Sequence, residues 1–246
     1  MSRARKTIIY NGCICHVIWQ MAHKEFLLQE EEDKMLLEKC ILRYKKKYSV
    51  YILERNIMDN HVHLIVYVHL ASDLSNFMRD VNSLFARLYN KRHNRCGNVI
   101  MDRFKSPVIQ STKYLIKLIG YIWLNHARSN KYSIKQVKNN PYCSLYYRSR
   151  GLIDPLCDSY QDFCDAAGIV NVAGTCEKSF CDMLLNYIIK KFFDELVYEV
   201  YEHLHSIGNK EFIKLRKYKK HLETLYKGYV FSIEFDDSQH LSSILI

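Results

Sequence analysis

Residues 60–66, NHVHLIV, place two histidines one residue apart at the start of an apolar, β-branched run. Successive side chains of an extended strand point to opposite faces, so His61 and His63 share one face, about 7 Å apart. Valine and leucine cover the other face, which predicts a strand buried on at least one side. Two imidazoles on a rigid strand form half of a site for a divalent cation, although two partly buried structural histidines would give the same pattern.

Residues 112–129, TKYLIKLIGYIWLNHARS, form the second informative stretch. A Ser-Thr pair that can cap a helix precedes apolar residues at helical spacing, without proline. Tyr121 and Asn125 lie four residues apart and therefore share one helical face. Asparagine is a mediocre helix former, so its position in an apolar helix requires a reason. A phenol nucleophile beside an amide-oxygen metal ligand would provide one; packing and local hydrogen bonding are the alternative.

The surrounding sequence predicts the fold class. The expected order is strand 13–20, helix 30–47, strand 49–57, strand 61–68 and helix 73–89. Asp59 and Asn60 join two strands by so short a turn that these must be antiparallel neighbours. This order begins an α+β fold, a ferredoxin-like antiparallel sheet with helices on one face. The histidines would lie mid-sheet, and the Tyr121 helix would cross their face.

Composition limits the classes of protein that fit. The chain has 246 residues, 48% of them hydrophobic, enough for one or two domains with a substantial core. Nine cysteines without a C-x-x-C pair disfavour zinc ribbons and indicate reduced thiols. The basic amino terminus lacks the features of a signal peptide, and no window approaches the ~18 apolar residues of a membrane span. We therefore expect a soluble cytoplasmic protein that does not interact with a membrane.

Charge divides the chain into two parts. Residues 1–150 hold 26 lysines and arginines against 11 acidic residues, a net charge of +15, whereas residues 151–246 hold 10 against 15, a net −5. A basic excess of this size is the electrostatic footprint of a phosphate-rich partner, with nucleic acid the natural one. A solvated basic surface is the alternative. The sequence thus predicts a nucleic-acid-binding domain over 1–150 and an acidic extension over 151–246.

The extension has a different character from the first domain. Residues 177–205 and 210–227 carry aromatic and aliphatic stripes that predict helices packed through a core. Because such helices need apolar partners, we expect the extension to pack on the first domain or on a second copy. Its role would be stability or control of access rather than chemistry, and the chain would be a monomer or a homodimer.

Three strings together resemble one known family. They are ILERNIMDNHVHLIV, NKRHNRCGNVIMDRFKS and YLIKLIGYIWLNHARS, and Ala4-Arg5-Lys6 followed by the block from His16 to Gln20 matches an amino-terminal pattern of the same family. The sequence is similar to the single-tyrosine HUH transposases, specifically the REP-associated tyrosine transposases, over about residues 3–150. The resemblance implies a metal-dependent transposase or endonuclease that cleaves and rejoins single-stranded DNA at palindromic hairpin elements. Such a protein would associate with the nucleoid when bound to DNA.

The resemblance also implies a role for each site residue. His61 and His63 would be metal ligands, Asn125 a third ligand or an amide that orients the metal, and Tyr121 the nucleophile. The cofactor would be Mg²⁺ or Mn²⁺, acting as Lewis acid and as template for in-line attack. Attack would form a phosphotyrosine on the 5′ side and release a 3′-hydroxyl, so the ester bond is conserved for rejoining. Basic positions expected to contact DNA are Arg3, Arg5, Lys6, Arg92, Arg95, Arg103, Lys105 and Arg128.

Departures from the family pattern lie beside the site residues. Asp59 replaces a usual proline, Gln20 a frequent arginine, and His126 a typical proline, while Asp102 stands near a usual glycine. One alternative is therefore a domesticated hairpin-DNA-binding protein that no longer cuts. Plasmid-replication initiators and relaxases also use an HUH site, but seldom with these neighbouring blocks. Histidine-triad hydrolases need a third histidine where this chain has Ile65.

Overall fold

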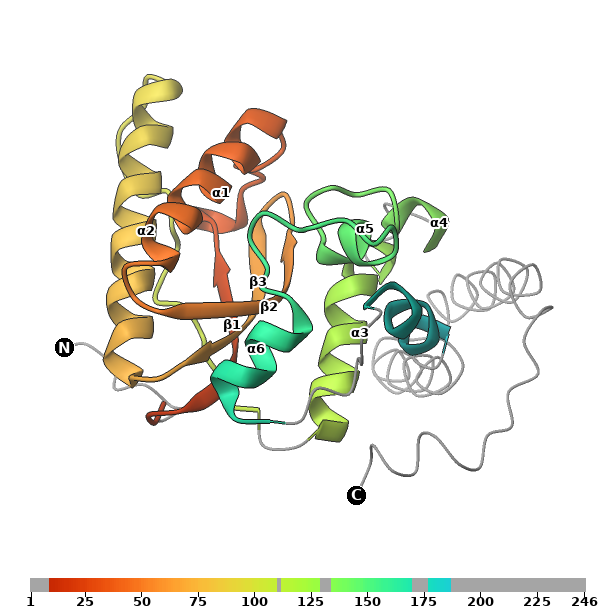
Figure 1. The fold of residues 1–246 in the computed structure, drawn as a ribbon. Helices are drawn as coiled ribbons and strands as arrows, with labels where there is room; N and C mark the ends of the chain where they lie inside the picture. The colour runs from red at the N-terminus through yellow and green to blue at the C-terminus, as the bar shows by residue number, and fades with distance from the viewer. Residues whose placement is uncertain (1–8, 110–111, 129–133, 170–176, 187–246) are drawn as a thin grey trace, which may run out of the picture. The chain divides into compact units, whose positions relative to one another are not determined.

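The computed structural model describes residues 9–109, 112–128, 134–169 and 177–186. Three antiparallel strands, β1 (Cys13–Gln20), β2 (Val50–Ile57) and β3 (His61–Val68), form a sheet in the order β1-β3-β2 (Figure 1). The most apolar strand, β3, is in the middle, where every residue after His61 is buried. A continuous β-branched run suits this position because both of its faces are covered.

The segment 99–109 continues the sheet beyond β1 as an irregular fourth strand. The backbone N–H groups of His16 and Ile18 donate to the carbonyl oxygens of Pro107 and Lys105, each at 2.9 Å. All neighbours are antiparallel, and the order 99–109, β1, β3, β2 is that of a ferredoxin-like sheet. Because proline has no N–H to donate, Pro107 suits an edge strand. The order of elements expected from the sequence contains no strand between residue 89 and the Tyr121 helix, so this edge strand is an addition to the predicted sheet.

Helices complete the fold. They are α1 (Glu31–Lys45), α2 (Ala71–Arg92), α3 (Thr112–Arg128), α4 (Ile134–Val137), α5 (Ser144–Arg148) and α6 (Tyr160–Ala167), with a 3-10 turn, η1, at Ala22–Lys24. Residues 177–186 are also helical. The α+β class and the predicted strands and helices up to α3 are confirmed, within a few residues of their expected bounds.

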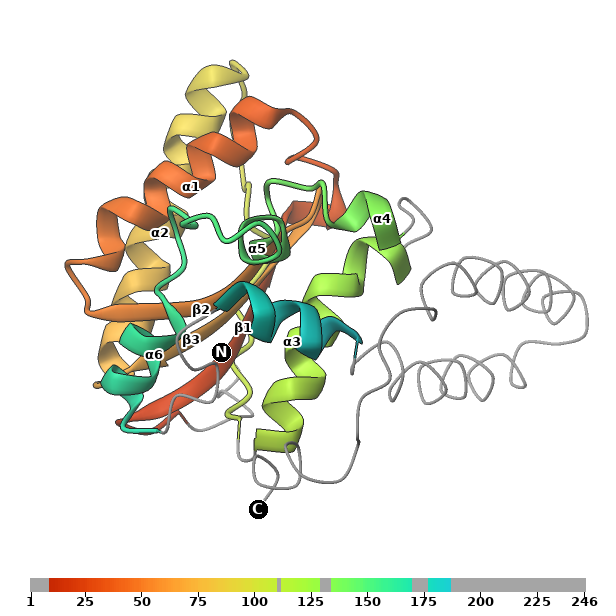
Figure 2. The same cartoon turned by 45° about the vertical axis from the view of Figure 1, so that its right-hand side comes forward.

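The two faces of the sheet are covered by different helices (Figures 1 and 2). Both α1 and α2 pack on the face that carries Val62, Leu64 and Val66, where they bury the main hydrophobic core. On the histidine face lie α3 and α6; the Phe163 ring of α6 lies 6.4 Å from that of Tyr67. The helices of the ferredoxin-like layer thus share one face as expected, and the later helices occupy the other.

A buried arginine on β2 ties a later loop to the sheet. The side chain of Arg55 is fully buried, and its Nε lies 2.9 Å from both carboxylate oxygens of Asp154. Its Nη1 lies 2.6 Å from Glu38 of α1. A buried guanidinium is tolerated only when carboxylates compensate for its desolvation. The loop that carries Asp154 is therefore an integral part of this fold.

A buried glutamate on the same strand anchors three helices. The Glu54 carboxylate accepts hydrogen bonds from Trp123 Nε1 of α3 and from the Tyr160 hydroxyl of α6, both at 2.8 Å. The hydroxyl of Ser144, at the start of α5, also donates to it. These contacts place the segment after α3 against the sheet, although it lies more than eighty residues from β2 in the chain.

The chain divides into two compact units, 1–181 and 182–246. The first unit extends beyond residue 150, where the change in charge suggested a boundary, because the buried partners of Arg55 and Glu54 lie at 154 and 160. The second unit is described only over residues 182–186, so the expected helices beyond residue 186 lie outside the described residues. Within the described ranges, no helix combines the length and apolarity needed to cross a bilayer.

Replacing Asp154 with alanine should lower the free energy of unfolding by about 3–5 kcal/mol, because Arg55 would remain buried without its main partner. Urea denaturation followed by circular dichroism measures the change. The matched control is Asp165→Ala on the exposed side of α6, expected within about 0.5 kcal/mol of the parent. Equal stability of the two variants would contradict a structural role for the Arg55 ion pair.

Candidate active site

The register of the sheet positions the two histidines of β3. His63 lies opposite Ile18 of β1 on one side and Asn56 of β2 on the other. Residues directly opposite in antiparallel strands point to the same face, so these side chains form one row across the sheet. His61 lies two residues earlier on the same face, with its ring centroid 4.9 Å from that of His63. The predicted pairing of the two imidazoles on one face is present.

Helix α3 brings the two predicted helical residues to these histidines. The side-chain nitrogen Nδ2 of Asn125 lies 2.9 Å from Nε2 of His63, and both side chains are buried. The Tyr121 ring centroid lies 5.5 Å from that of His63, with the rings nearly perpendicular. Four residues that are up to 64 positions apart in the chain therefore meet at one place.

Two buried hydrogen bonds between β2 and α3 set the rotation of α3 about its own axis. Asn56 Nδ2 donates to the backbone oxygen of Ile122 at 2.7 Å, and Trp123 Nε1 donates to Glu54. Trp123 is completely buried, so its large side chain fixes which face of the helix packs on the protein core. With 122 and 123 held this way, the face that carries Tyr121 and Asn125 meets the histidine row.

A third histidine, His16 of β1, belongs to the cluster and was not assigned a role from the sequence. Its Nε2 lies 2.9 Å from Nδ1 of His63, the ring centroids are 5.1 Å apart, and the rings are stacked. Its ring centroid is also 6.3 Å from that of Tyr121. One signal in the sequence could have placed His16 in the cluster. It shares a strand face with Ile18 and Gln20, and a ferredoxin-like order places that strand beside β3.

Burial shapes the electrostatics of these rings. Desolvation lowers the pKa of His16 from 6.5 to about 4, because the cationic ring would lose its hydration. Desolvation also lowers the pKa of His61, and the carboxylate of Asp59 partly offsets the effect. Both imidazoles are neutral at neutral pH, which is the form that binds a metal ion.

The turn between β2 and β3 orients His61. Oδ1 of Asn60 lies 2.6 Å from Nδ1 of His61, and the backbone oxygen of Asn60 accepts from Met21 N–H at 2.9 Å. Asp59, at the position where the family has proline, forms an ion pair with Lys34 at 2.9 Å. The turn is held by side-chain and backbone contacts in place of the rigidity that a proline would supply.

The basic residues expected to contact DNA have different environments. Arg103 and Lys105 are exposed on the edge strand, and Lys105 lies opposite Ile18, so its side chain projects on the histidine face. The neighbouring residues are less exposed: Phe104 packs against the hydrophobic core, and Ser106 is buried. By contrast, Arg95 lies 3.8 Å from the Glu25 carboxylate. Arg3, Arg5, Lys6 and the Arg128 side chain lie outside the described residues.

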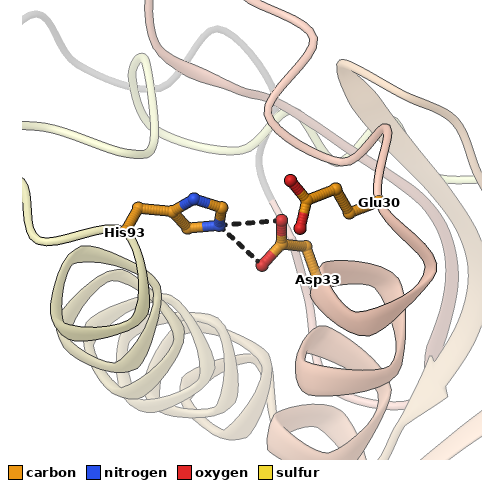
Figure 3. A group of neighbouring side chains, drawn as sticks. All are labelled: Glu30, Asp33 and His93. Atoms are coloured by element: carbon orange, nitrogen blue, oxygen red, sulfur yellow. Dashed lines mark hydrogen bonds and ion pairs between the residues drawn. The ribbon is translucent and has the colours of Figure 1, made fainter.

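A separate cluster joins the start of α1 to the end of α2. Glu30, Asp33 and His93 place their potential ligand atoms within 4.8 Å of one another, and His93 Nε2 lies 2.9 and 3.0 Å from the Asp33 oxygens (Figure 3). The guanidinium of Arg92 lies 2.5 Å from Glu30 and 3.2 Å from Asp33. Because this guanidinium already forms ion pairs with both carboxylates, we assign the cluster to helix–helix contact. Arg92 is correspondingly less available to phosphate.

Comparisons with known proteins concern the sequence and the fold of this chain. Residues 9–122 match the family model described as "Transposase IS200 like", a span that includes both β3 histidines and Tyr121. The structure of a REP-associated tyrosine transposase bound to a REP hairpin is similar, with a TM-score of 0.51 and 21% identity over 65% of this chain and 92% of that one. At this identity the likeness concerns the fold.

A putative transposase from Deinococcus radiodurans is more distant. It has a TM-score of 0.35 and 14% identity over 54% of this chain and 99% of that one. No protein with a curated description matches the sequence.

Proposed function

We infer the function of this chain from its family: through residues 9–122 it belongs to the IS200-like transposases. We propose that it is a metal-dependent single-strand DNA endonuclease and strand-transferase that acts through a phosphotyrosine. The observation that carries the proposal is the meeting of Tyr121 and Asn125 with His63 and His61 on the sheet. A nucleophile beside a set of metal-binding side chains is the minimal requirement for this chemistry.

The side chains present fit a divalent cation. An amide oxygen only accepts, so the contact with Asn60 Oδ1 puts the proton of His61 on Nδ1 and leaves a lone pair on Nε2. Asn125 Nδ2 only donates, so Nε2 of His63 also carries a lone pair. Two imidazoles and one amide oxygen form a moderately soft set that suits Mn²⁺ and accepts Mg²⁺.

His61 and His63 would hold the ion through Nε2. Asn125 would hold it through Oδ1, which a half-turn of the amide exchanges with Nδ2. When bound, Mg²⁺ or Mn²⁺ supplies Lewis-acid polarisation of the scissile phosphate.

Tyr121 performs the covalent step. Its phenolic oxygen gives up its proton and attacks phosphorus, the bond from phosphorus to the 3′ oxygen breaks, and that oxygen takes up a proton and leaves as a 3′-hydroxyl. The 5′ side remains attached to the tyrosine as a phosphodiester. Attack by another 3′-hydroxyl reverses the exchange, rejoins a strand and regenerates the phenol, without an external source of energy. Trp123 and Asn56 hold α3 so that Tyr121 approaches from the histidine side of the sheet.

The DNA would lie along the edge strand. Lys105, Ile18, His63 and Asn56 occupy one row, so the exposed Lys105 is two strands, about 10 Å, from the histidine. Arg103 lies two residues earlier in the chain and is also exposed. A basic edge beside a catalytic row can track the backbone of a single strand or of a hairpin end. The similar fold bound to a REP hairpin supports hairpin DNA as the substrate class.

The proposal is tested by incubating the full chain with a labelled single-stranded hairpin and Mn²⁺. A covalent protein–DNA adduct on a denaturing gel, abolished by EDTA, is the expected result. Hairpin binding without an adduct, across several hairpin sequences, would favour the alternative of a DNA-binding protein that no longer cuts.

Replacing Arg103 and Lys105 together with alanine should weaken hairpin binding and reduce its dependence on salt. Each lost phosphate contact lowers the slope of log K against log salt by about 0.7–0.9, so the double variant should lose up to about 1.8. Fluorescence anisotropy at several salt concentrations measures both quantities. The matched control is Lys39→Ala with Arg43→Ala, which removes the same charge from exposed positions on α1, across the sheet. Equal effects of the two double variants would contradict an edge-strand DNA path.

A further inference from the structure

His16 makes the contact on which a further role depends. Its Nε2 lies 2.9 Å from Nδ1 of His63, the ring nitrogen on the side away from Asn125. The side chains are 5% and 2% exposed, so water does not compete freely for this hydrogen bond. The contact can therefore persist when Nε2 of His63 binds an ion.

The protons of the cluster can be counted. A neutral imidazole has one N–H and one lone pair, and the Asn125 contact makes Nε2 of His63 the acceptor. The proton of His63 is then on Nδ1, where it donates to Nε2 of His16. His16 in turn carries its own proton on Nδ1. With Nδ2 of Asn125 facing His63, as in this structure, only this arrangement of neutral rings satisfies both contacts.

From this geometry we propose that His16 is a positioning residue, which holds His63 in the tautomer and orientation that present Nε2 to the metal ion. The inference rests on the proposed metal-dependent function. A metal-binding histidine commonly donates its other N–H to a partner that fixes the ring. Asn60 does this for His61, and His16 does it for His63.

The backbone of His16 is held on both sides. His16 pairs with Ile65 of β3 on one side, and on the other side its backbone N–H donates to the carbonyl oxygen of Pro107 in the edge strand. Because this backbone is fixed, the His16 side chain holds its acceptor nitrogen, Nε2, at a defined position. His63 therefore needs no rearrangement of its ring before it binds an ion, which favours a higher affinity.

Two variants of equal length separate hydrogen bonding from packing. His16→Gln keeps an acceptor near the position of Nε2, whereas His16→Met fills similar space without a strong acceptor. The measurement is Mn²⁺ affinity of the intact protein, without DNA, from the electron paramagnetic resonance signal of free Mn²⁺. The methionine variant should bind about 10- to 100-fold more weakly than the parent, and the glutamine variant within about threefold.

His63→Ala in the same titration distinguishes two kinds of failure. If His63→Ala binds Mn²⁺ as the parent does, the proposed metal site itself is wrong. If His63→Ala loses binding and His16→Met does not, only the role of His16 is overturned. Equal losses for the glutamine and methionine variants would assign His16 to packing and also overturn it.

A measurement on the unmutated protein covers the case in which a variant fails to fold. Nitrogen NMR of protein labelled in its histidine rings reports which nitrogen of each ring is protonated. His63 is expected to carry its proton on Nδ1, and His16 to have an unprotonated Nε2. A proton on Nε2 of His63 would overturn the proposal.

Discussion

Replacing Tyr121 with phenylalanine is expected to abolish the covalent adduct with hairpin DNA while leaving DNA binding and stability near those of the parent. The ring contacts with His63 and His16 would remain, because phenylalanine keeps the aromatic ring. Only the phenolic oxygen that forms the phosphotyrosine is lost. Removal of a nucleophile generally lowers the rate by orders of magnitude, so we expect a loss of at least about a thousandfold.

The control for this variant is Tyr114→Phe. Tyr114 lies seven residues earlier, two helical turns from Tyr121 on about the same face of α3, and is 42% exposed. It should form adduct at the rate of the parent. Adduct formation by the Tyr121→Phe protein, measured on a denaturing gel and mapped by peptide mass spectrometry, would identify another nucleophile and contradict the assignment.

Removing either β3 histidine should have the second largest effect. In His61→Ala and His63→Ala, a sparse set of ligands loses one imidazole, and we expect cleavage to fall by at least about a hundredfold. EDTA should have the same effect on the parent protein, and Mn²⁺ should restore at least as much activity as Mg²⁺. Single-turnover cleavage of a labelled hairpin over a range of metal concentrations measures this.

His69→Ala provides the matched control. It removes a histidine that is exposed, lies just past the end of β3 and contacts the Tyr67 hydroxyl at 3.2 Å, about 20 Å along the strand from His63. Its cleavage should equal that of the parent. His61 is only partly buried, so His61→Ala also guards against a loss caused by unfolding of the His63 variant. Cleavage that persists in EDTA in either site variant would exclude the metal role.

Local periodicity was sufficient to predict the two halves of the candidate site. The alternation of a strand places His61 and His63 on one face, and the spacing of a helix places Tyr121 and Asn125 on another, whatever the rest of the chain does. The apolar run after His63 likewise predicts a central, buried strand, because exposing it to water would cost too much. The basic character of residues 1–150 is a property of composition and needs no coordinates.

Only the tertiary structure decided how these halves meet and what surrounds them. His16 joins the cluster through the register of β1 against β3, and Lys105 joins the row through the edge strand; strand register is set by long-range pairing. The rotation of α3 depends on Glu54 and Asn56. The first unit continues past residue 150, where Asp154 and Tyr160 are buried partners of β2. Such contacts join residues far apart in the chain, so no local pattern in the sequence encodes them.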